Sequence, residues 1–198
     1  AGAIKFAAES AGVDDTFVVA NGDIVTALPI ADLVRFHHAL GREATIHLTP
    51  VDDPSSFGVV ELSNDRLVRQ FVEKPAQGET SSNLVNAGTY VVEPSVLDRI
   101  PADVPVSVER VTFPQLVAEG ELAGFSTEDA WIDTGRPEFY LKANLAYADS
   151  AGAVVRSQIS TSASLSGVVA DGATIEDGAV VRNSVILPGA VIEADARV

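Results

Sequence analysis

Phe17-Val18-Val19-Ala20-Asn21-Gly22-Asp23 is the stretch that decides the fold, because four apolar residues run directly into a turn signal. A short apolar run bounded by turn residues predicts a strand buried in a sheet that is covered on both faces. Such sheets bind ligands beyond the carboxyl ends of their strands. Asp23 is therefore a candidate metal-binding or ligand-binding carboxylate, with Asn21 and Gly22 forming the turn before it. The alternative is an ordinary strand-ending turn, since turns favour these residue types.

Composition and charge narrow the class of protein. The 198 residues are enough for one large domain or two modest ones, and 46% hydrophobic with 21% charged residues is typical of a soluble globular protein. The formal net charge of -15 argues against a nucleic acid or an anionic membrane as a partner. The chain has neither a signal-peptide pattern nor an apolar run of about 18 residues. The absence of cysteine fits a cytoplasmic protein.

The order of the expected elements indicates a mixed α/β sheet. Helical and strand patterns alternate through the first 48 residues, which predicts parallel strands joined by crossover helices. Two strands then flank the polar turn 63–66, which predicts an antiparallel hairpin. The expected helices are 4–10, 30–40, 94–100, 108–118 and 137–149, and the expected strands are 17–20, 44–48, 57–62, 67–72, 86–92 and 131–133.

The composition changes after Ser150, so we place the domain boundary there, with one domain over 1–150 and a second over 151–198. In the second, apolar residues recur at every sixth position in the series Val169, Ile175, Val181 and Leu187, with Asp-Gly and Pro-Gly turns between them. A second six-residue series lies one position earlier and contains Thr174, Val180, Ile186, Ile192 and Val198. A period of six with such turns is the signature of a parallel β-helix. We expect the recurring apolar residues to fill its interior.

Asp23 and Asp133 share a sequence context, because each ends a short apolar strand and precedes a turn and a helix. If both strands lie in one sheet, both carboxylates emerge at its carboxyl edge. Mg²⁺ is typically held by one or two carboxylates, with substrate phosphates and waters completing its shell. The pair is therefore a candidate Mg²⁺ site. The alternative for Asp133 is a cap on the helix that follows it.

Lys74 is a candidate phosphate ligand in a chain with only three lysines. Pro75 predicts an extended backbone at Lys74, so that its side chain would project from the end of a strand. The alternative is a solvated surface lysine. The three histidines form no metal pattern with nearby cysteines or carboxylates, and His37 is interpreted as a partly buried residue on the apolar face of its helix. Trp131 is interpreted as a core residue.

Five motifs occur in an order that resembles a known family. They are Asn21-Gly22-Asp23-Ile24, Phe57-Gly58-Val59-Val60, Phe71-Val72-Glu73-Lys74-Pro75, Asn86-Ala87-Gly88-Thr89-Tyr90 and Trp131-Ile132-Asp133-Thr134-Gly135-Arg136-Pro137. With the hexapeptide tail, they resemble the sugar-1-phosphate nucleotidyltransferases over essentially the whole chain. The stretch Ser107-Val108-Glu109-Arg110-Val111-Thr112-Phe113-Pro114 is similar to the mannose-1-phosphate guanylyltransferase subgroup.

The resemblance implies an α/β fold with a Rossmann-like mixed sheet, followed by a left-handed parallel β-helix of hexapeptide repeats that assembles a homo-oligomer. The glycine-rich triphosphate loop of the family has no match here. Residues 1–4 resemble the end of the family's segment beside the nucleotide base, and the chain contains no methionine. We therefore expect an N-terminally truncated catalytic domain that is inactive by itself.

The resemblance also implies a reaction, in which a nucleoside triphosphate (GTP in the subgroup) and a sugar 1-phosphate (mannose 1-phosphate) give an NDP-sugar and pyrophosphate. Asp23 and Asp133 would hold Mg²⁺, and Lys74 would contact the sugar phosphate. Glu73 and Asn86 would bind sugar hydroxyls. The remaining expected substrate contacts are Asn21, Gly22 and the backbone of Gly58, where a side chain would block the sugar.

Two alternatives remain open. The same fold could act on glucose 1-phosphate with UTP or dTTP, because base selectivity in this family resides largely in the region without a match. The chain could instead be a non-catalytic assembly subunit, as the unmatched triphosphate loop suggests. A hexapeptide acyltransferase fits less well, because such enzymes use a histidine and residues 151–198 contain none.

Overall fold

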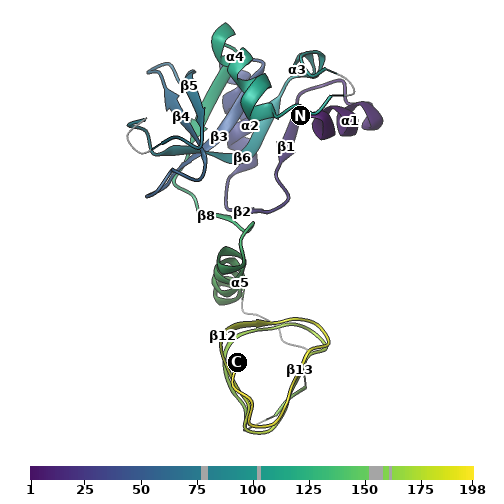
Figure 1. The fold of residues 1–198 in the computed structure, drawn as a ribbon. Coiled ribbons are helices and arrows are strands. Elements are labelled where there is room, and N and C mark those ends of the chain that lie inside the picture. Colours follow the sequence, from purple (N-terminus) through teal and green to yellow (C-terminus); the bar gives the residue numbers. More distant parts are fainter. Residues whose placement is uncertain (77–79, 102–103, 152–157, 161) are drawn as a thin grey trace. The chain divides into compact units, whose positions relative to one another are not determined.

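The computed structural model describes residues 1–76, 80–101, 104–151, 158–160 and 162–198. These residues form two compact units, Ala1–Trp131 and Ile132–Val198, whose elements are labelled in Figure 1. The boundary expected after residue 150 rests on composition. Compactness instead groups helix α5 (Pro137–Ala151) with the C-terminal strands.

The first unit is built on a mixed six-stranded sheet with the order β5-β4-β6-β3-β7, to which β1 is added through β6. The strands of this sheet are β1 (Phe17–Ala20), β3 (Ala44–Pro50), β4 (Gly58–Leu62), β5 (Val68–Glu73), β6 (Leu84–Val92) and β7 (Leu122–Ser126). Two further strands, β2 (Ile24–Thr26) and β8 (Trp131–Asp133), are short. The helices are α1 (Gly2–Ala11), α2 (Ile30–Leu40), α3 (Ser95–Asp98), the π-helix η1 (Val108–Thr112) and α4 (Phe113–Glu119).

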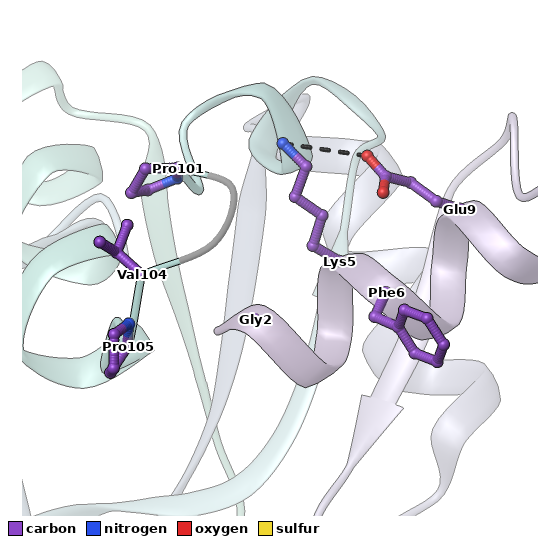
Figure 2. Close-up of a pocket in the computed structure, with 7 residues that line it drawn as sticks. All are labelled: Gly2, Lys5, Phe6, Glu9, Pro101, Val104 and Pro105. Atoms are coloured by element: carbon purple, nitrogen blue, oxygen red, sulfur yellow. Dashed lines mark ion pairs between the residues drawn. The ribbon is translucent and has the colours of Figure 1, made fainter.

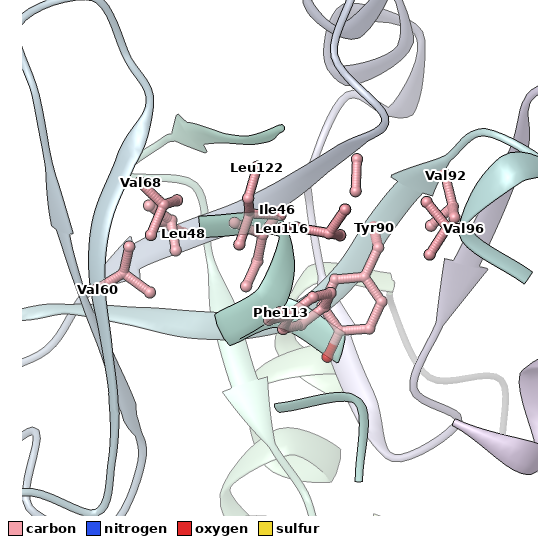
Figure 3. Packing of buried hydrophobic residues seen from close by; sticks show 11 residues of the cluster. Ile46, Leu48, Val60, Val68, Tyr90, Val92, Val96, Phe113, Leu116 and Leu122 are labelled. Carbon is pink, nitrogen blue, oxygen red and sulfur yellow. The ribbon is translucent and has the colours of Figure 1, made fainter. Parts of the chain in front are cut away.

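Strands β3 and β6 form the buried centre of this sheet. On one face, Tyr90 of β6 packs against Phe113 of α4 with ring centroids 5.1 Å apart, inside the apolar cluster of Figure 3. On the other face, Val91 clusters with Leu33 of α2. Successive strand residues point to opposite faces, so a strand covered on both sides is buried along nearly its whole length, as β3 and β6 are. The expected sheet with two covered faces is therefore confirmed at β3 and β6.

The parallel pairing expected for the first strand is wrong. β1 pairs antiparallel with β6, in the register Phe17↔Val92 to Ala20↔Thr89, and β3 pairs antiparallel with the other edge of β6. β1 and β3 therefore run in the same direction but are separated by a strand that comes later in the chain. Val18 is 41% exposed, so β1 is half-buried rather than buried. The parallel pair of the sheet is formed by β3 and β7.

Local signals explain the helices and the hairpin. The expected helix 30–40 is confirmed, and Gly41 ends it with φ 61 while its N–H donates to the carbonyl of His37. Pro114 lies in the first turn of α4, where a missing N–H leaves no hydrogen bond unmade. The antiparallel hairpin of β4 and β5 is also confirmed. Among the described residues, no helix has both the length and the apolar character needed to cross a bilayer.

His47 of β3 couples the stability of this unit to pH. Its side chain is 1% exposed, and Nε2 lies 2.9 Å from Oγ1 of Thr127. Burial lowers the pKa of His47 to about 4, although the negative charge of Asp129 opposes this shift. An unfolded histidine has a pKa of about 6.5, so the unfolded chain binds the proton more tightly. His47 should therefore lower the free energy of unfolding as the pH drops from about 6.5 towards 4, and should have little effect on it above that range.

We expect His47→Gln to reduce this pH dependence. The difference in unfolding free energy between pH 7 and pH 5 should shrink by roughly 1–2 kcal/mol, because glutamine does not titrate in that range. Urea titrations at the two pH values measure it, and His38→Gln, which removes an exposed histidine, is the matched control. If the pH dependence were the same in His47→Gln as in the wild type, the lowered pKa of His47 would not be its cause.

The second unit combines α5 with short strands that stack in parallel. One stack contains β9 (Gln158–Ile159), β11 (Thr174–Ile175) and β13 (Val191–Ile192), and a second contains β10 (Ser164–Val169) and β12 (Val180–Ile186). Thr174 pairs with Gln158 on one side and with Val191 on the other, so each strand meets the equivalent strand of the next coil. Figure 1 shows these coils with a triangular outline. The left-handed β-helix of hexapeptide repeats stays a prediction.

One expected interior residue is placed wrongly by the six-residue spacing. Leu187 is 55% exposed, whereas Ile186 is 5% exposed and joins Val181 in the apolar interior. The step between these two interior residues is one position shorter than the repeat. Asn183, with φ 46, adopts a left-handed conformation inside this step. The interior therefore passes from the first six-residue series at Val181 to the second at Ile186.

Candidate active site

The central sheet splits halfway along β6, and several predicted site residues gather at this split. β1 pairs with residues 89–92 of β6 and β4 pairs with β6 at Val85, both on the edge opposite β3. The carboxyl end of β1 and the amino end of β4 therefore face each other across residues 86–88. In α/β sheets, ligands commonly bind at switch points, where neighbouring strands diverge in this way.

Gly88 lies in a bulge at the split. The register between β6 and β3 shifts opposite residues 86–90, and Gly88 has φ 77. Asn21 closes against this bulge, since its backbone N–H donates to the carbonyl of Gly88 at 2.8 Å. A Cβ on residue 88 would lie 2.8 Å from Nδ2 of Asn21. Bulges commonly re-aim residues beside active sites, and here the bulge places Asn21 against β6.

We expect Gly88→Ala to destabilise the first unit by roughly 2–3 kcal/mol. The substitution combines an unfavourable positive φ with a contact that displaces Asn21. Urea unfolding measures the change, and Gly22→Ala is the matched control, because a Cβ on residue 22 would meet nothing within 4 Å. Equal stabilities of the two variants would show that the bulge does not depend on glycine.

Trp131 lies at the split and was missed as a site residue. Its Nε1–H donates to the carbonyl of Ala87 at 2.9 Å, and its ring meets Phe57 edge-on with centroids 5.6 Å apart. The carbonyl of Phe57 in turn accepts the backbone N–H of Lys74 at 2.9 Å. The available signal was the indole N–H, which needs an acceptor when the ring is partly buried. These contacts connect Lys74 to the same stretch of β6 that Asn21 contacts.

The extended backbone expected for Lys74 is wrong. Its φ is 53, in the left-handed region, even though a proline follows. Such a conformation costs of order 1 kcal/mol for a residue other than glycine, and it persists where the surroundings impose it. The side chain of Lys74 is exposed. Strain of this kind is common at functional sites, so the geometry favours the interpretation of Lys74 as a ligand-binding residue.

Gly58 and Glu73 pair with each other where β4 begins and β5 ends. Gly58 is buried, which agrees with a role through its backbone. The side chain of Glu73 lies outside what the structure describes, so its expected contact with a sugar hydroxyl stays a prediction.

Asn86 is held by three hydrogen bonds within the protein. Its Nδ2 group donates to the hydroxyl of Tyr90 at 3.0 Å and to Oε1 of Glu109 at 2.8 Å, and its Oδ1 accepts from the N–H of Gly88 at 3.0 Å. Both amide protons are therefore engaged. A sugar hydroxyl could still donate to the second lone pair of Oδ1. Glu109 was not among the predicted site residues but belongs to this network.

Asp23 and Asp133 supply donors of the type that Mg²⁺ prefers. Asp23 is exposed in the turn between β1 and β2, a strand that the sequence did not predict. Asp133 ends β8, and its Oδ1 accepts the N–H of Gly135 at 2.8 Å. Gly135 lies before α5 begins at Pro137, so this contact closes a turn, and the cap on the helix stays an alternative. Two carboxylates with phosphates and waters fit this ion. That they share one ion remains a prediction, because they belong to different units.

A hollow of about 450 Å³ lies beside α1 (Figure 2). Its lining is mostly apolar and is formed by Gly2, Lys5, Phe6, Glu9, Pro101, Val104 and Pro105. Nζ of Lys5 donates to the carbonyl of Ile100 at 2.8 Å and lies 3.9 Å from Oε1 of Glu9. The sequence resemblance places residues 1–4 beside the nucleotide base, which makes this hollow a candidate base site.

Solved structures of other proteins share the fold of this chain. A glucose-1-phosphate thymidylyltransferase from Bacillus anthracis, in complex with a sucrose, has a TM-score of 0.65 at 25% identity and covers 74% of this chain and 60% of that one. HddC from Yersinia pseudotuberculosis complexed with GMP-PN has a TM-score of 0.60 at 30% identity and covers 74% and 61%.

Curated relatives are named as guanylyltransferases. Mannose-1-phosphate guanylyltransferase 1 of Oryza sativa subsp. japonica is 36% identical over 190 residues, which cover 94% of this chain and 52% of that protein. Mannose-1-phosphate guanyltransferase of Schizosaccharomyces pombe is 43% identical over 136 residues, covering 68% and 37%. The chain spans about half or less of the length of these relatives. A family model described as nucleotidyl transferase matches residues 1–150, and the chain belongs to this family.

Proposed function

We propose that the protein carrying this chain transfers a nucleotidyl group from GTP to mannose 1-phosphate, giving GDP-mannose and pyrophosphate. The observation that carries the proposal is the split at residues 86–88 of β6, which connects Asn21 and Lys74 within one unit. Family membership supports nucleotidyl transfer, and the names of the curated relatives support guanine and mannose.

The proposed chemistry demands positioning and charge neutralisation more than covalent catalysis. A phosphate oxygen of the sugar phosphate attacks the α-phosphorus of the triphosphate, and pyrophosphate leaves; alignment of the two substrates and stabilisation of phosphate charge carry such reactions. Lys74 would hold the phosphate of the sugar substrate. Asp23 and Asp133 would hold Mg²⁺, which when bound neutralises charge on phosphate oxygens.

The sugar would lie against the amino end of β4 and the bulge of β6. Gly58 would let the sugar approach the backbone, while Glu73 and Oδ1 of Asn86 would accept from its hydroxyls. The turn of Asn21 and Gly22 would lie beside the same part of β6. The coils of the second unit would serve assembly into a homo-oligomer, for which light scattering of the purified protein is the test.

A panel of substrates tests the proposed specificity. Steady-state rates should be highest for GTP with mannose 1-phosphate among GTP, UTP and dTTP, each combined with mannose 1-phosphate and glucose 1-phosphate. The second candidate is glucose 1-phosphate with dTTP, which the solved thymidylyltransferase of similar fold favours. A maximum for that pair would replace the guanylyltransferase assignment while keeping nucleotidyl transfer.

A further inference from the structure

A cluster of His37, His38 and Glu93 lies beyond the carboxyl end of β6, whereas the candidate active site lies at the middle of that strand. Glu93 follows the last residue of β6, about 20 Å of strand away from Asn86. One ligand atom of each of the three side chains lies within 4.8 Å of the ligand atoms of the other two. We propose that this cluster binds a divalent transition metal of the Zn²⁺ class, at a site separate from the proposed Mg²⁺ site.

The donor atoms already lie near metal-binding separations. Nε2 of His37 is 2.9 Å from Oε1 of Glu93. Two ligands of a tetrahedral Zn²⁺ lie about 3.4 Å apart, because each lies about 2.1 Å from the metal. His38 is exposed, so its ring can rotate towards the other two ligands. The three donor atoms, which lie within 4.8 Å of one another, would have to shift by about an ångström to share one ion.

A buried hydroxyl orients the first ligand. Nδ1 of His37 lies 2.9 Å from Oγ1 of Thr45, and both side chains are 1% exposed or less. Metal-binding histidines usually fix their second ring nitrogen in this way, which sets the ring orientation. A threonine hydroxyl can donate or accept, so Thr45 supports His37 both with and without a metal on Nε2.

Glu93 is the carboxylate best placed to serve as a ligand. Its Oε1 also accepts from the hydroxyl of Thr16 at 2.8 Å, which fixes the carboxylate in place. The neighbouring carboxylates are engaged with arginines instead, Glu43 with Arg99 at 2.7 Å and Glu121 with Arg42 at 3.6 Å. A hollow of about 310 Å³ adjoins the cluster and has room for a water as the fourth ligand.

The sequence interpretation that the histidines form no metal pattern considered only cysteines and carboxylates nearby in the chain. Glu93 is 56 residues from His37 in sequence, so spacing rules that consider nearby residues could not find it. Two imidazoles with one carboxylate suit Zn²⁺, Co²⁺ or Ni²⁺, whereas Mg²⁺ prefers oxygen donors. A metal bound here would join the end of α2 to the end of β6, and would therefore stabilise the first unit.

Titration with Co²⁺ tests the proposal directly, because nitrogen ligands in a tetrahedral site give strong visible absorption. We expect this absorption for the protein that carries this chain, and a loss of at least tenfold in Co²⁺ affinity in His38→Gln and in Glu93→Gln. His47→Gln is the matched control and should bind as tightly as the wild type. Asp23→Asn with Asp133→Asn should also retain the absorption, since the proposed Mg²⁺ site is separate.

Thermal unfolding gives a second readout that is independent of activity. Zn²⁺ at about a hundred times its Kd should raise the Tm by about 5 °C or more in the wild type and in His47→Gln, but not in His38→Gln. Equal Co²⁺ affinity in wild type and His38→Gln would overturn the proposal. Absorption that disappears only when Asp23 and Asp133 are replaced would overturn it as well, by assigning the bound metal to the candidate active site.

Discussion

Asp23→Asn should lower the rate of NDP-sugar formation by about a thousandfold in the protein that carries this chain. The substitution keeps the shape of the side chain but removes the negative charge that would hold Mg²⁺. Asp23 is exposed in a turn, so the free energy of unfolding should change by about 0.5 kcal/mol or less. Initial rates at saturating substrate, combined with urea unfolding of the same preparation, separate a loss of catalysis from a loss of folding.

Asp65→Asn is the matched control for this prediction. Asp65 is also an exposed carboxylate in a turn, but it lies in the hairpin between β4 and β5, where it accepts from the hydroxyl of Ser63. Its replacement should leave the rate within about twofold of the wild type. Comparable losses of activity in both variants would point to a general effect of surface charge instead of a specific metal ligand.

A double variant tests whether the two aspartates act together. If Asp23 and Asp133 hold one ion, removing either already disrupts its binding, so Asp23→Asn with Asp133→Asn should be about as slow as the slower single variant. Independent roles would instead multiply the two losses. Rates that remain near wild type in the double variant would falsify the proposed metal site.

The sequence was sufficient to predict those elements that depend on residues close together in the chain. The ends of α2 follow from apolar spacing and the glycine after it, and the hairpin of β4 and β5 follows from a short polar turn between two strands. The motif around Asn86 correctly identified a strand at the candidate site. In these cases the residues that determine the element are adjacent in the chain, so a window of sequence contains the necessary information.

The sequence was insufficient to predict pairings and contacts between residues that are far apart in the chain. β1 pairs with β6, which lies about seventy residues later, and no pattern in residues 17–20 could select that strand or its direction. The hydrogen bond between Asn86 and Glu109 joins residues that are 23 positions apart, so the sequence around Glu109 did not indicate its place beside Asn86. The cluster of His37 with Glu93 is a third example, since the fold alone brings the two residues together.

Two substitutions at Lys74 should affect catalysis equally but stability differently. Lys74→Ala should lower kcat/KM for the sugar phosphate by about a hundredfold to a thousandfold, because it removes the cation proposed to bind the phosphate. Lys74→Gly should lose the same activity. It should also be more stable than Lys74→Ala by about 1 kcal/mol, because glycine adopts the φ of 53 without the steric conflict that alanine keeps.

Arg66→Gly is the matched control, because Arg66 also has a left-handed backbone but lies in a turn without a proposed function. Arg66 has φ 67 in the hairpin between β4 and β5, so glycine should stabilise the protein there by a similar amount. Its activity should stay near wild type, because the hairpin turn lies at the end of β4 away from the split. If Lys74→Gly retained activity, Lys74 would be a solvated lysine in a strained turn. If Lys74→Gly were no more stable than Lys74→Ala, the left-handed backbone at residue 74 would not be strained.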